Sequence, residues 1–386
     1  MSEKLTIAAP ADVDELKAFL PVHLRTYRRS LEDAEAWADA LPIEHFRILR
    51  RGGRPIGGMN LIPMGQWFGG RAVGMTGIGS VGIEPAERAS GAGTAFMTMA
   101  LEELHAGGVP LSTLYPATQT VYRRAGYELA GHFIRYRLWT DHIDVRDRTL
   151  DVEFTEDREA LTRIYNERAR RTNGALDRGA FMWERIYRPD RSDAYLMIGP
   201  DGPEGYISST RREGEDRDRM HAHVVALTRA AARRILTFIA DHRSFVEAVE
   251  WTGAPADPFD FQLSEPRIDI DNALPWMTRV IDVPAALTER GYSDAIDAEL
   301  HLRVRDDVLP ANNAMFVLHV AGGKAEVRPG GSGAMSIDVR GLAPLYTGYA
   351  SAHELVAAGY IDAPETDVLT ANAIFAGPTP WLADFF

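Results

Sequence analysis

The sequence predicts an α/β protein in which two tandem mixed-sheet domains are followed by an α+β domain. Residues 1–140 alternate strand-type and helix-type apolar patterns, and residues 151–252 repeat that order. From Trp276 the pattern changes to short strands with Gly-rich turns, followed by three helices. We therefore expect domains at residues 1–145, 146–285 and 286–386.

The first domain should begin with a strand at Leu5–Ala8 and an amphipathic helix at Asp12–Tyr27. We expect two strands to follow, joined by a hairpin at Arg51–Arg54, and then a helix that stops at Gly107. A further strand and a short helix that carries Tyr122 should complete the domain. The later elements are expected at Phe46–Leu49, Pro55–Leu61, Val73–Ile83, Leu111–Tyr115 and, for the short helix, from Thr118.

The second domain should repeat this order up to a strand at Phe245–Thr252, before a Pro-rich loop at Ala254–Pro266. Its strand-to-helix junction, Ala226–Ala232, contains neither Pro nor Gly, so alanine side chains would fill the space that a phosphate needs. We expect a scaffold without a ligand there. In the third part, strands are expected at Met277–Val283, Ala298–Val304, Ala314–Val320, Ala325–Arg328 and Ser336–Val339, and helices at Gly341–Tyr349, Ser351–Ala358 and Glu365–Phe375.

The most informative segment joins the strand that ends at Ile83 to the helix that follows Gly93. Pro85 ends the strand, and Arg88, Gly91 and Gly93 form an Arg-x-x-Gly-x-Gly loop. Glycines allow the backbone to approach a ligand closely, and the amides at the start of the helix point at that ligand. The loop lacks the Gly-x-Gly-x-x-Gly and Gly-Lys-Ser/Thr patterns of dinucleotide and P-loop sites. It predicts a pyrophosphate site.

Composition excludes several classes of protein. The chain has 386 residues, 45% of them hydrophobic, a net charge of -13 and no cysteine. These values exclude a disordered chain, a disulfide framework and a thiolate metal site, and they disfavour nucleic acid as a partner. The N-terminus shows no basic segment followed by an apolar run, as a secretion signal would, and no apolar stretch of about eighteen residues that could span a membrane is present. The sequence therefore predicts a cytoplasmic protein with no membrane partner.

The loop, the strand before it and a Tyr-x-x-x-Gly-Tyr segment at 122–127 resemble the acetyl-coenzyme A site of the GNAT N-acetyltransferases. The three-part order, together with segments 276–292, Leu345–Gly348 and Pro380–Phe386, resembles the Eis (enhanced intracellular survival) family of these enzymes. The resemblance implies a catalytic domain, a degenerate copy and a domain similar to sterol carrier proteins. It also implies acetyl-coenzyme A as acetyl donor, no metal, and a homo-oligomer, with a hexamer as one option.

By that resemblance, the backbone of Val81, Gly82 and Ile83 would pair with pantetheine, and Ala117 and Thr118 would line the far side of the donor. Tyr122 would be the general acid and the main-chain carboxylate of Phe386 the general base. The pyrophosphate would lie on the loop formed by Arg88, Ala89, Ser90, Gly91, Ala92, Gly93 and Thr94.

These roles are chemically reasonable. A phenol with a pKa of about 10 can protonate a thiolate as it leaves, and the attacking amine must first lose a proton. A carboxylate is a weak base unless burial raises its pKa. The apolar tail Trp381–Phe386 favours such burial. Docking of the tail without catalysis is the alternative for Phe386, and packing on the sheet is the alternative for Tyr122.

Trp37 and Tyr115 are candidates for an acceptor pocket, although aromatic residues at such positions are more often core. His221 and His223 share one face of a strand, but two ligands without a third do not make a metal site. Members of the family commonly carry a run of arginines where this chain has Arg88-Ala89-Ser90, and often an acidic penultimate residue where it has Phe385.

The acceptor is expected to be a primary amine: an aminoglycoside, a polyamine or a lysine side chain. The alternatives are a protein that binds coenzyme A or a hydrophobic ligand without turnover.

Overall fold

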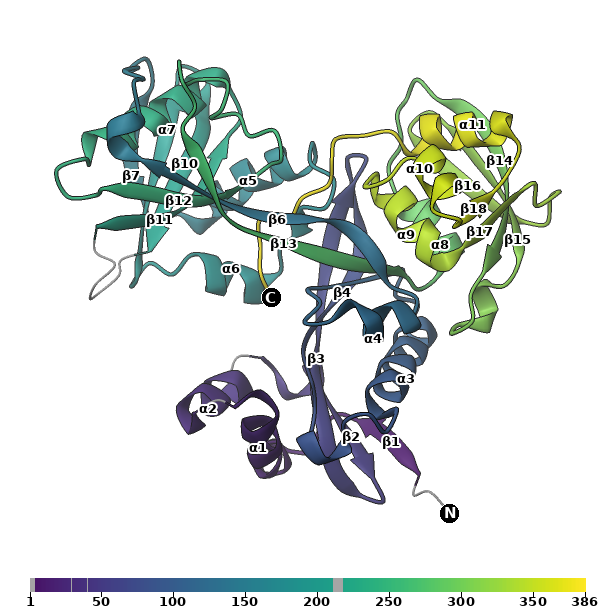
Figure 1. The fold of residues 1–386 in the computed structure, drawn as a ribbon. Helices are drawn as coiled ribbons and strands as arrows, with labels where there is room; N and C mark the ends of the chain where they lie inside the picture. The colour runs from purple at the N-terminus through teal and green to yellow at the C-terminus, as the bar shows by residue number, and fades with distance from the viewer. Residues whose placement is uncertain (1–3, 29, 40, 211–217) are drawn as a thin grey trace.

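The chain folds into three units, two of which share one large sheet. The computed structural model describes residues 4–28, 30–39, 41–210 and 218–386. Figure 1 shows the first unit in purple and blue, the second in teal and the third in yellow and green. The predicted order of two mixed-sheet units followed by an α+β unit is confirmed.

The first unit has the predicted sequence of elements, and it adds a helix after the first one and a long final strand. Its first helix begins after Asp12, whose side chain accepts a hydrogen bond from the Glu15 amide, and it buries Leu16, Phe19 and Leu20 against the sheet. The elements are β1 (Leu5–Ala8), α1 (Val13–Tyr27), α2 (Leu31–Asp39), β2 (Phe46–Arg51), β3 (Arg54–Phe68), β4 (Arg71–Ile83), α3 (Ala92–Ala106), β5 (Leu111–Leu114), α4 (Gln119–Arg124) and β6 (Glu128–Trp139).

The second unit repeats the arrangement of strands around a helix. Its junction before α7 is closed by Thr228, whose hydroxyl accepts a hydrogen bond from the Ala231 amide. The elements are β7 (Asp151–Thr155), α5 (Arg158–Ala169), β8 (Leu176–Asp177), α6 (Ala180–Ile186), β9 (Ser192–Gly199), β10 (Gly202–Thr210), β11 (Arg219–Ala226), α7 (Arg229–Asp241), β12 (Ala248–Gly253) and β13 (Ile268–Val280).

The third unit is a five-stranded sheet with helices, and its interior is filled by buried side chains such as Leu300, Leu318 and Tyr346. Its strands follow the order β16-β15-β14-β17-β18. The elements are α8 (Val283–Glu289), β14 (Asp297–Arg305), β15 (Met315–Ala321), β16 (Lys324–Pro329), β17 (Met335–Asp338), α9 (Val339–Thr347), α10 (Ala352–Ala357), β18 (Ile361–Asp362) and α11 (Glu365–Phe375).

The first two units exchange strands. The large sheet has the order β1-β2-β3-β4-β5-β13-β6-β12-β11-β10-β9-β7, with β8 paired to β3. Thus β13 lies between β5 and β6, and β6 pairs along its other edge with β12 of the second unit. The prediction that Met277–Val283 opens the third unit is wrong. Ile268–Val280 is a strand of the large sheet, and α8 begins at Val283.

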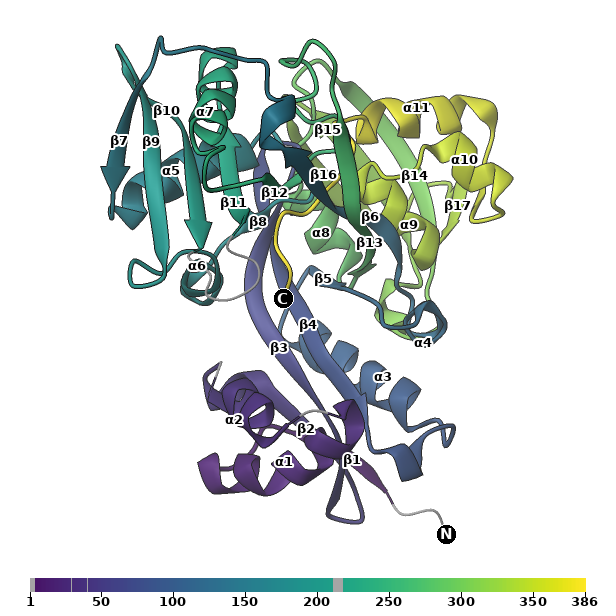
Figure 2. The ribbon, with the colours of Figure 1, turned by 60° about the vertical axis from the view of Figure 1, so that its left-hand side comes forward.

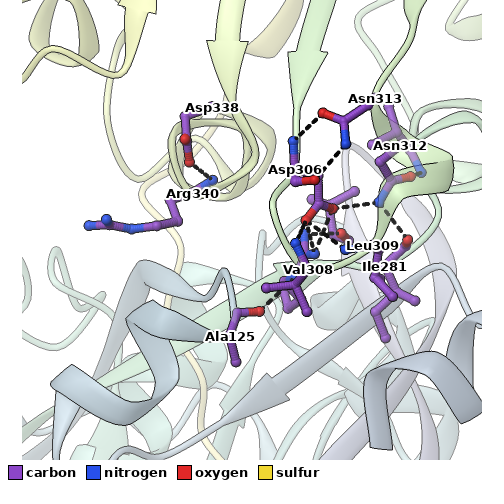
Figure 3. Close-up of polar contacts among 12 residues, drawn as sticks. Ala125, Ile281, Asp306, Val308, Leu309, Asn312, Asn313, Asp338 and Arg340 are labelled. Carbon is purple, nitrogen blue, oxygen red and sulfur yellow. Dashed lines mark hydrogen bonds and ion pairs between the residues drawn. The ribbon is translucent and has the colours of Figure 1, made fainter. Parts of the chain in front are cut away.

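A buried ion pair joins the first two units to the third. Arg279 on β13 donates two hydrogen bonds to the Asp306 carboxylate at 2.7 and 2.6 Å, and both side chains are fully buried. Figure 3 shows Asp306 also accepting hydrogen bonds from Val308, Leu309 and Asn312. These contacts satisfy the buried carboxylate completely and hold the third unit against the sheet.

The last residues do not stay with the third unit. Figures 1 and 2 show the yellow tail running back from α11 to end between the second unit and strands β3 and β4. Trp381 forms a bridge with His132, and the Leu382 amide donates to the His132 carbonyl at 3.1 Å. The chain terminus is therefore delivered to the first unit.

Candidate active site

The site lies where β4 and β5 separate. These parallel strands pair only at Met75–Gly77 with Leu111–Thr113. Farther along, β4 continues beside β3 alone, and Ser80 and Val81 oppose the single residue Met59 in a bulge. Ser80 has a φ of 50°, which is unusual for a residue with a side chain. The bulge leaves Ser80 and Val81 without regular partners on β3, at the point where β4 and β5 have separated.

The predicted phosphate loop joins β4 to α3 through two residues in the left-handed backbone region. Ala89 and Gly91 both have positive φ, 60° and 83°, and the Ser90 hydroxyl donates to the Glu87 carbonyl at 2.7 Å. α3 begins at Ala92 without a capping side chain at Gly91, and a Cβ on Gly91 would meet open space. The Ala92 amide makes a long hydrogen bond of 3.4 Å to the Ser90 hydroxyl, and the amides that follow it at the start of the helix can point at an anion, which fits a diphosphate.

Arginines from another part of the sequence surround this loop. Arg51 donates to the Ser90 hydroxyl at 3.4 Å and to Glu87 at 3.2 Å, and Arg54 also pairs with Glu87. Arg88 donates to the Thr26 carbonyl at 3.0 Å. The sequence pattern marked the hairpin residues Arg51 and Arg54 only as a turn. Their guanidinium groups lie beside the loop, paired with Glu87 and, for Arg54, also with Glu84.

A cavity of about 670 Å³ brings together candidates that lie far apart in the sequence. The other predicted donor-site residues do not line it; they lie on the end of β4, in the loop and at the start of α4: Gly82, Ile83, Arg88 to Thr94 and Thr118. The candidates that line it are Trp37, Val81, Tyr115, Ala117, Tyr122 and Phe386.

Tyr122 is held on α4 with its side chain 7% exposed. Its ring lies edge-on to that of Tyr127, with centroids 6.1 Å apart. Burial raises the pKa of Tyr122 to about 12. The phenol therefore keeps its proton at neutral pH.

The tail that reaches the cavity is fixed by a buried ion pair from the second unit. Arg178 donates to both carboxylate oxygens of Asp384, at 3.0 and 2.7 Å, and the two side chains are 0% and 1% exposed. The Arg178 guanidinium also lies 3.6 Å from the centre of the Tyr165 ring. On the other side, the Tyr115 hydroxyl donates to the Asp384 carbonyl at 2.6 Å.

His223 belongs to this cluster. Burial, and then the charges of Arg178 and Arg168, hold the pKa of His223 well below its usual range, so the ring is neutral. Because Arg178 can only donate, the Nε2 atom of His223 accepts, and its Nδ1–H faces the Tyr206 hydroxyl at 3.0 Å. Among the described residues, no group of three or more His, Cys, Asp or Glu side chains is arranged to hold a metal.

Phe386 lies directly on β4. A Cβ on Gly77 would come within 2.7 Å of the Phe386 ring, and a Cβ on Gly79 would lie 3.8 Å from its carboxyl carbon. Both positions are glycine, so the ring and the carboxylate can approach the strand next to the Ser80–Val81 bulge. The terminal carboxylate and the bulge therefore occupy the same end of the cavity.

Aromatic and polar groups line the remainder of the cavity. Trp37 stacks on His23 with centroids 4.1 Å apart, and Tyr115 packs on Phe385 at 4.6 Å. Burial, together with the charge of Asp384, raises the pKa of Tyr115 well above its usual value. The Trp37 indole nitrogen and the Asn60 Oδ1 are buried without a hydrogen-bond partner in the described part of the chain. Asn60 was not predicted, because an isolated Asn in a strand carries no sequence signal.

Comparisons with known proteins agree with the three-unit architecture. Two family models, each described as an acetyltransferase (GNAT) domain, match residues 9–130 and 174–280, and a sterol carrier protein domain model matches residues 283–383. No helix in the described residues is long and apolar enough to span a bilayer.

The relatives cover nearly the whole chain. The crystal structure of a GCN5-related N-acetyltransferase from Anabaena variabilis is 36% identical, with a TM-score of 0.94, over 99% of this chain and 100% of that one. An uncharacterized N-acetyltransferase from Streptomyces griseus is 26% identical over 82% of this chain and 83% of its own. N-acetyltransferase Eis from Mycobacterium tuberculosis is 23% identical over 90% and 91%. The chain is therefore a member of the GCN5-related N-acetyltransferase family, an acetyl-coenzyme A-dependent enzyme of the Eis type.

Proposed function

We propose that the protein transfers the acetyl group of acetyl-coenzyme A to a primary amine by direct attack, with Tyr122 as general acid and the terminal carboxylate of Phe386 as general base. The observation that carries the proposal is that both residues line one cavity beside the β4 bulge. In the reaction, an N–C bond forms and the C–S bond breaks. The carboxylate takes the amine proton, and Tyr122 protonates the leaving thiolate and regains its proton from solvent.

In this proposal the donor lies between β4 and β5. The backbone of Val81, Gly82 and Ile83 would hold pantetheine, while Ala117 and Thr118 would form the opposite wall. The amides from Ala89 to Thr94 would bind the pyrophosphate, with Arg88 adding positive charge. The open start of α3 supports this assignment. The second unit offers a contrast, because Thr228 occupies the equivalent helix start.

The base has a plausible chemical environment. A terminal carboxylate has a reference pKa of about 3.5, and removal from water raises such a value. Phe386 is held against Gly77 and Gly79 and is half-buried, which supports a carboxylate that is partly desolvated and fixed. The Asp384–Arg178 pair supplies the rigidity, since it anchors the tail two residues earlier.

The acceptor is proposed to bind between Trp37, Tyr115 and Asn60. The unpartnered Asn60 oxygen suits an N–H donor, and the aromatic rings suit the apolar part of an amine or a cation. Aminoglycosides, polyamines and the lysine side chains of peptides are the classes to compare. We also propose a cytoplasmic homo-oligomer, which light scattering with size-exclusion chromatography and cell fractionation would test.

A thiol-release assay with acetyl-coenzyme A and a panel of amines tests the function. Two residues appended after Phe386 should abolish turnover because they displace the carboxylate. A semisynthetic protein of natural length that ends in a carboxamide should lose activity as well, because the amide cannot accept the proton. Two residues inserted between Gly322 and Gly323, in the turn of the third unit, are the control and should leave the rate unchanged. Full activity of the carboxamide form would refute the role of the base.

A further inference from the structure

A second, smaller cavity adjoins the acceptor site. It has a volume of about 300 Å³ and lies where β6, β10, β11 and β12 meet α6 and the tail. Arg185 and Phe385 line both cavities, so they stand at the passage between them. Phe385 is half exposed and packs on Tyr115, which leaves the smaller cavity in reach of a ligand that occupies the larger one.

The acidic side chains of the smaller cavity are already neutralised. Glu250 is 4% exposed and accepts two hydrogen bonds from Arg137, at 2.8 and 2.6 Å, and it lies 3.2 Å from His221. Asp384 is the acid of the tail, and Arg178 neutralises it. Neither carboxylate is therefore available for a cationic ligand without breaking a buried pair.

The basic side chains are not neutralised to the same degree. Arg185 donates to the Phe385 carbonyl at 3.4 Å and lies 5.7 Å from the centre of the Phe181 ring, and it forms no ion pair within the described residues. Arg135 has one acidic partner, Asp271, at 3.9 Å, and that carboxylate is in closer contact with Arg137. Both guanidinium groups can therefore accept another anion.

Neutral polar groups complete the lining. Ser208, Thr210 and Thr252 contribute from β10 and β12, and Trp251 and Phe133 form apolar walls. Hydroxyl groups beside two arginines are suited to carboxylate or phosphate oxygens.

We propose that the acceptor is an amine that also carries one anionic group, a carboxylate or a phosphate, which Arg185 and Arg135 bind in the smaller cavity. This inference rests on the proposed function, because the amine must lie in the larger cavity beside Phe386. A polycation would place a positive group against Arg185, so polyamines should be poor acceptors.

The test uses acceptors of matched length in the thiol-release assay. Hexylamine, hexamethylenediamine and ε-aminocaproate differ only in the group at the far end of the chain, which is neutral, cationic or a carboxylate. A comparison of phosphoethanolamine with ethanolamine tests whether the anionic group can be a phosphate. One charge-assisted contact predicts a preference of about tenfold or more in kcat/KM for the anionic member of a pair, mainly through KM. Arg185→Gln and Arg135→Gln should each reduce that ratio. Arg188→Gln is the control, because Arg188 follows the same helix but pairs with Asp190 outside both cavities.

Calorimetry separates this inference from the proposed function. ε-Aminocaproate should bind to the wild-type protein with coenzyme A present, and Arg185→Gln should weaken that binding by about tenfold. If no amine is acetylated but this binding is observed, the proposed function fails and the anion site stands. Equal kcat/KM for hexylamine and ε-aminocaproate, a preference for the diamine, or binding that does not depend on Arg185 would overturn the anion site.

Discussion

Replacing Asp384 with asparagine should uncouple the end of the chain from the active site without unfolding the protein. Asp384 is the residue of the tail that a buried ion pair holds, because its carboxylate pairs with Arg178 where both are shielded from water. Asparagine keeps the shape of the side chain but leaves the Arg178 charge without a counterion. Release of the last residues would admit water to that charge.

The magnitude follows from the contacts that remain. Removing one partner of a buried pair costs about 3–5 kcal/mol. Against this, residues 384–386 keep the hydrogen bond from Tyr115, worth about 1 kcal/mol, and the partial burial of the Phe386 ring, worth about 1.5 kcal/mol. The difference of about 0.5–2.5 kcal/mol predicts a fall of about twofold to seventyfold in the docked population, and in kcat with it.

Asp306→Asn is the matched control. Asp306 forms an equally buried pair with Arg279, but it lies at the junction with the third unit and cannot be released by a chain end. Its loss should lower the free energy of unfolding by about 3–5 kcal/mol, with kcat of the folded enzyme little changed. Burial raises the pKa of Asp306, but the charge of Arg279 and the hydrogen bonds that the carboxylate accepts outweigh this effect and hold the pKa below its usual value. The contribution of Asp306 to stability should therefore be lost as the pH falls through that lowered pKa.

The measurements are steady-state thiol release, denaturant unfolding and the rate at which carboxypeptidase removes Phe386. Asp384→Asn should lose kcat and gain carboxypeptidase sensitivity, whereas Asp306→Asn should mainly lose stability. Wild-type kcat in Asp384→Asn, or equal losses of kcat in both variants, would refute the idea that the second unit positions the terminus.

Three further outcomes are expected. Tyr122→Phe should lower kcat by about a hundredfold or more, with little change in the affinity for acetyl-coenzyme A by calorimetry; an unchanged kcat would exclude the general acid. Because burial raises the pKa of Tyr122 to about 12, kcat/KM should rise with pH as the base and then the amine lose protons, with no descending limb up to about pH 10; a decline near neutral pH would contradict this. Gly77→Ala should displace the Phe386 ring and reduce kcat/KM by about tenfold. Gly91→Ala adds its methyl group in open space, away from the tail, and should leave Phe386 protected from carboxypeptidase.

Local patterns in the sequence predicted much of the fold and the centre of the site. The helix that buries Leu16, Phe19 and Leu20 was evident from its periodicity. A strand, a Gly-containing loop and a helix in succession have only a few geometries, so the positions of Gly91 and Gly93 at the start of α3 could be expected. The apolar composition of the last residues likewise predicted a docked tail.

Contacts between distant residues could not be predicted in this way. Arg178 and Asp384 are 206 positions apart, and no local pattern marks either as a partner of the other. The strand expected at Met277–Val283 was placed with the third unit, whereas the observed strand, Ile268–Val280, belongs to the large sheet, because an apolar pattern indicates a strand but not which sheet it joins. That Arg185 forms no ion pair within the described residues depends on the position of each acid around it, which only the folded chain defines.

The position of β13 has a consequence for any attempt to dissect the enzyme. A fragment ending near residue 145 would keep the loop, α3 and Tyr122 but would lack the strand that lies between β5 and β6. Such a fragment would leave the facing edges of β5 and β6 without hydrogen-bond partners. It should therefore aggregate, or pair with a strand of another copy in place of β13. The first unit therefore cannot be isolated from the second, because β13 forms part of the sheet beside the candidate site.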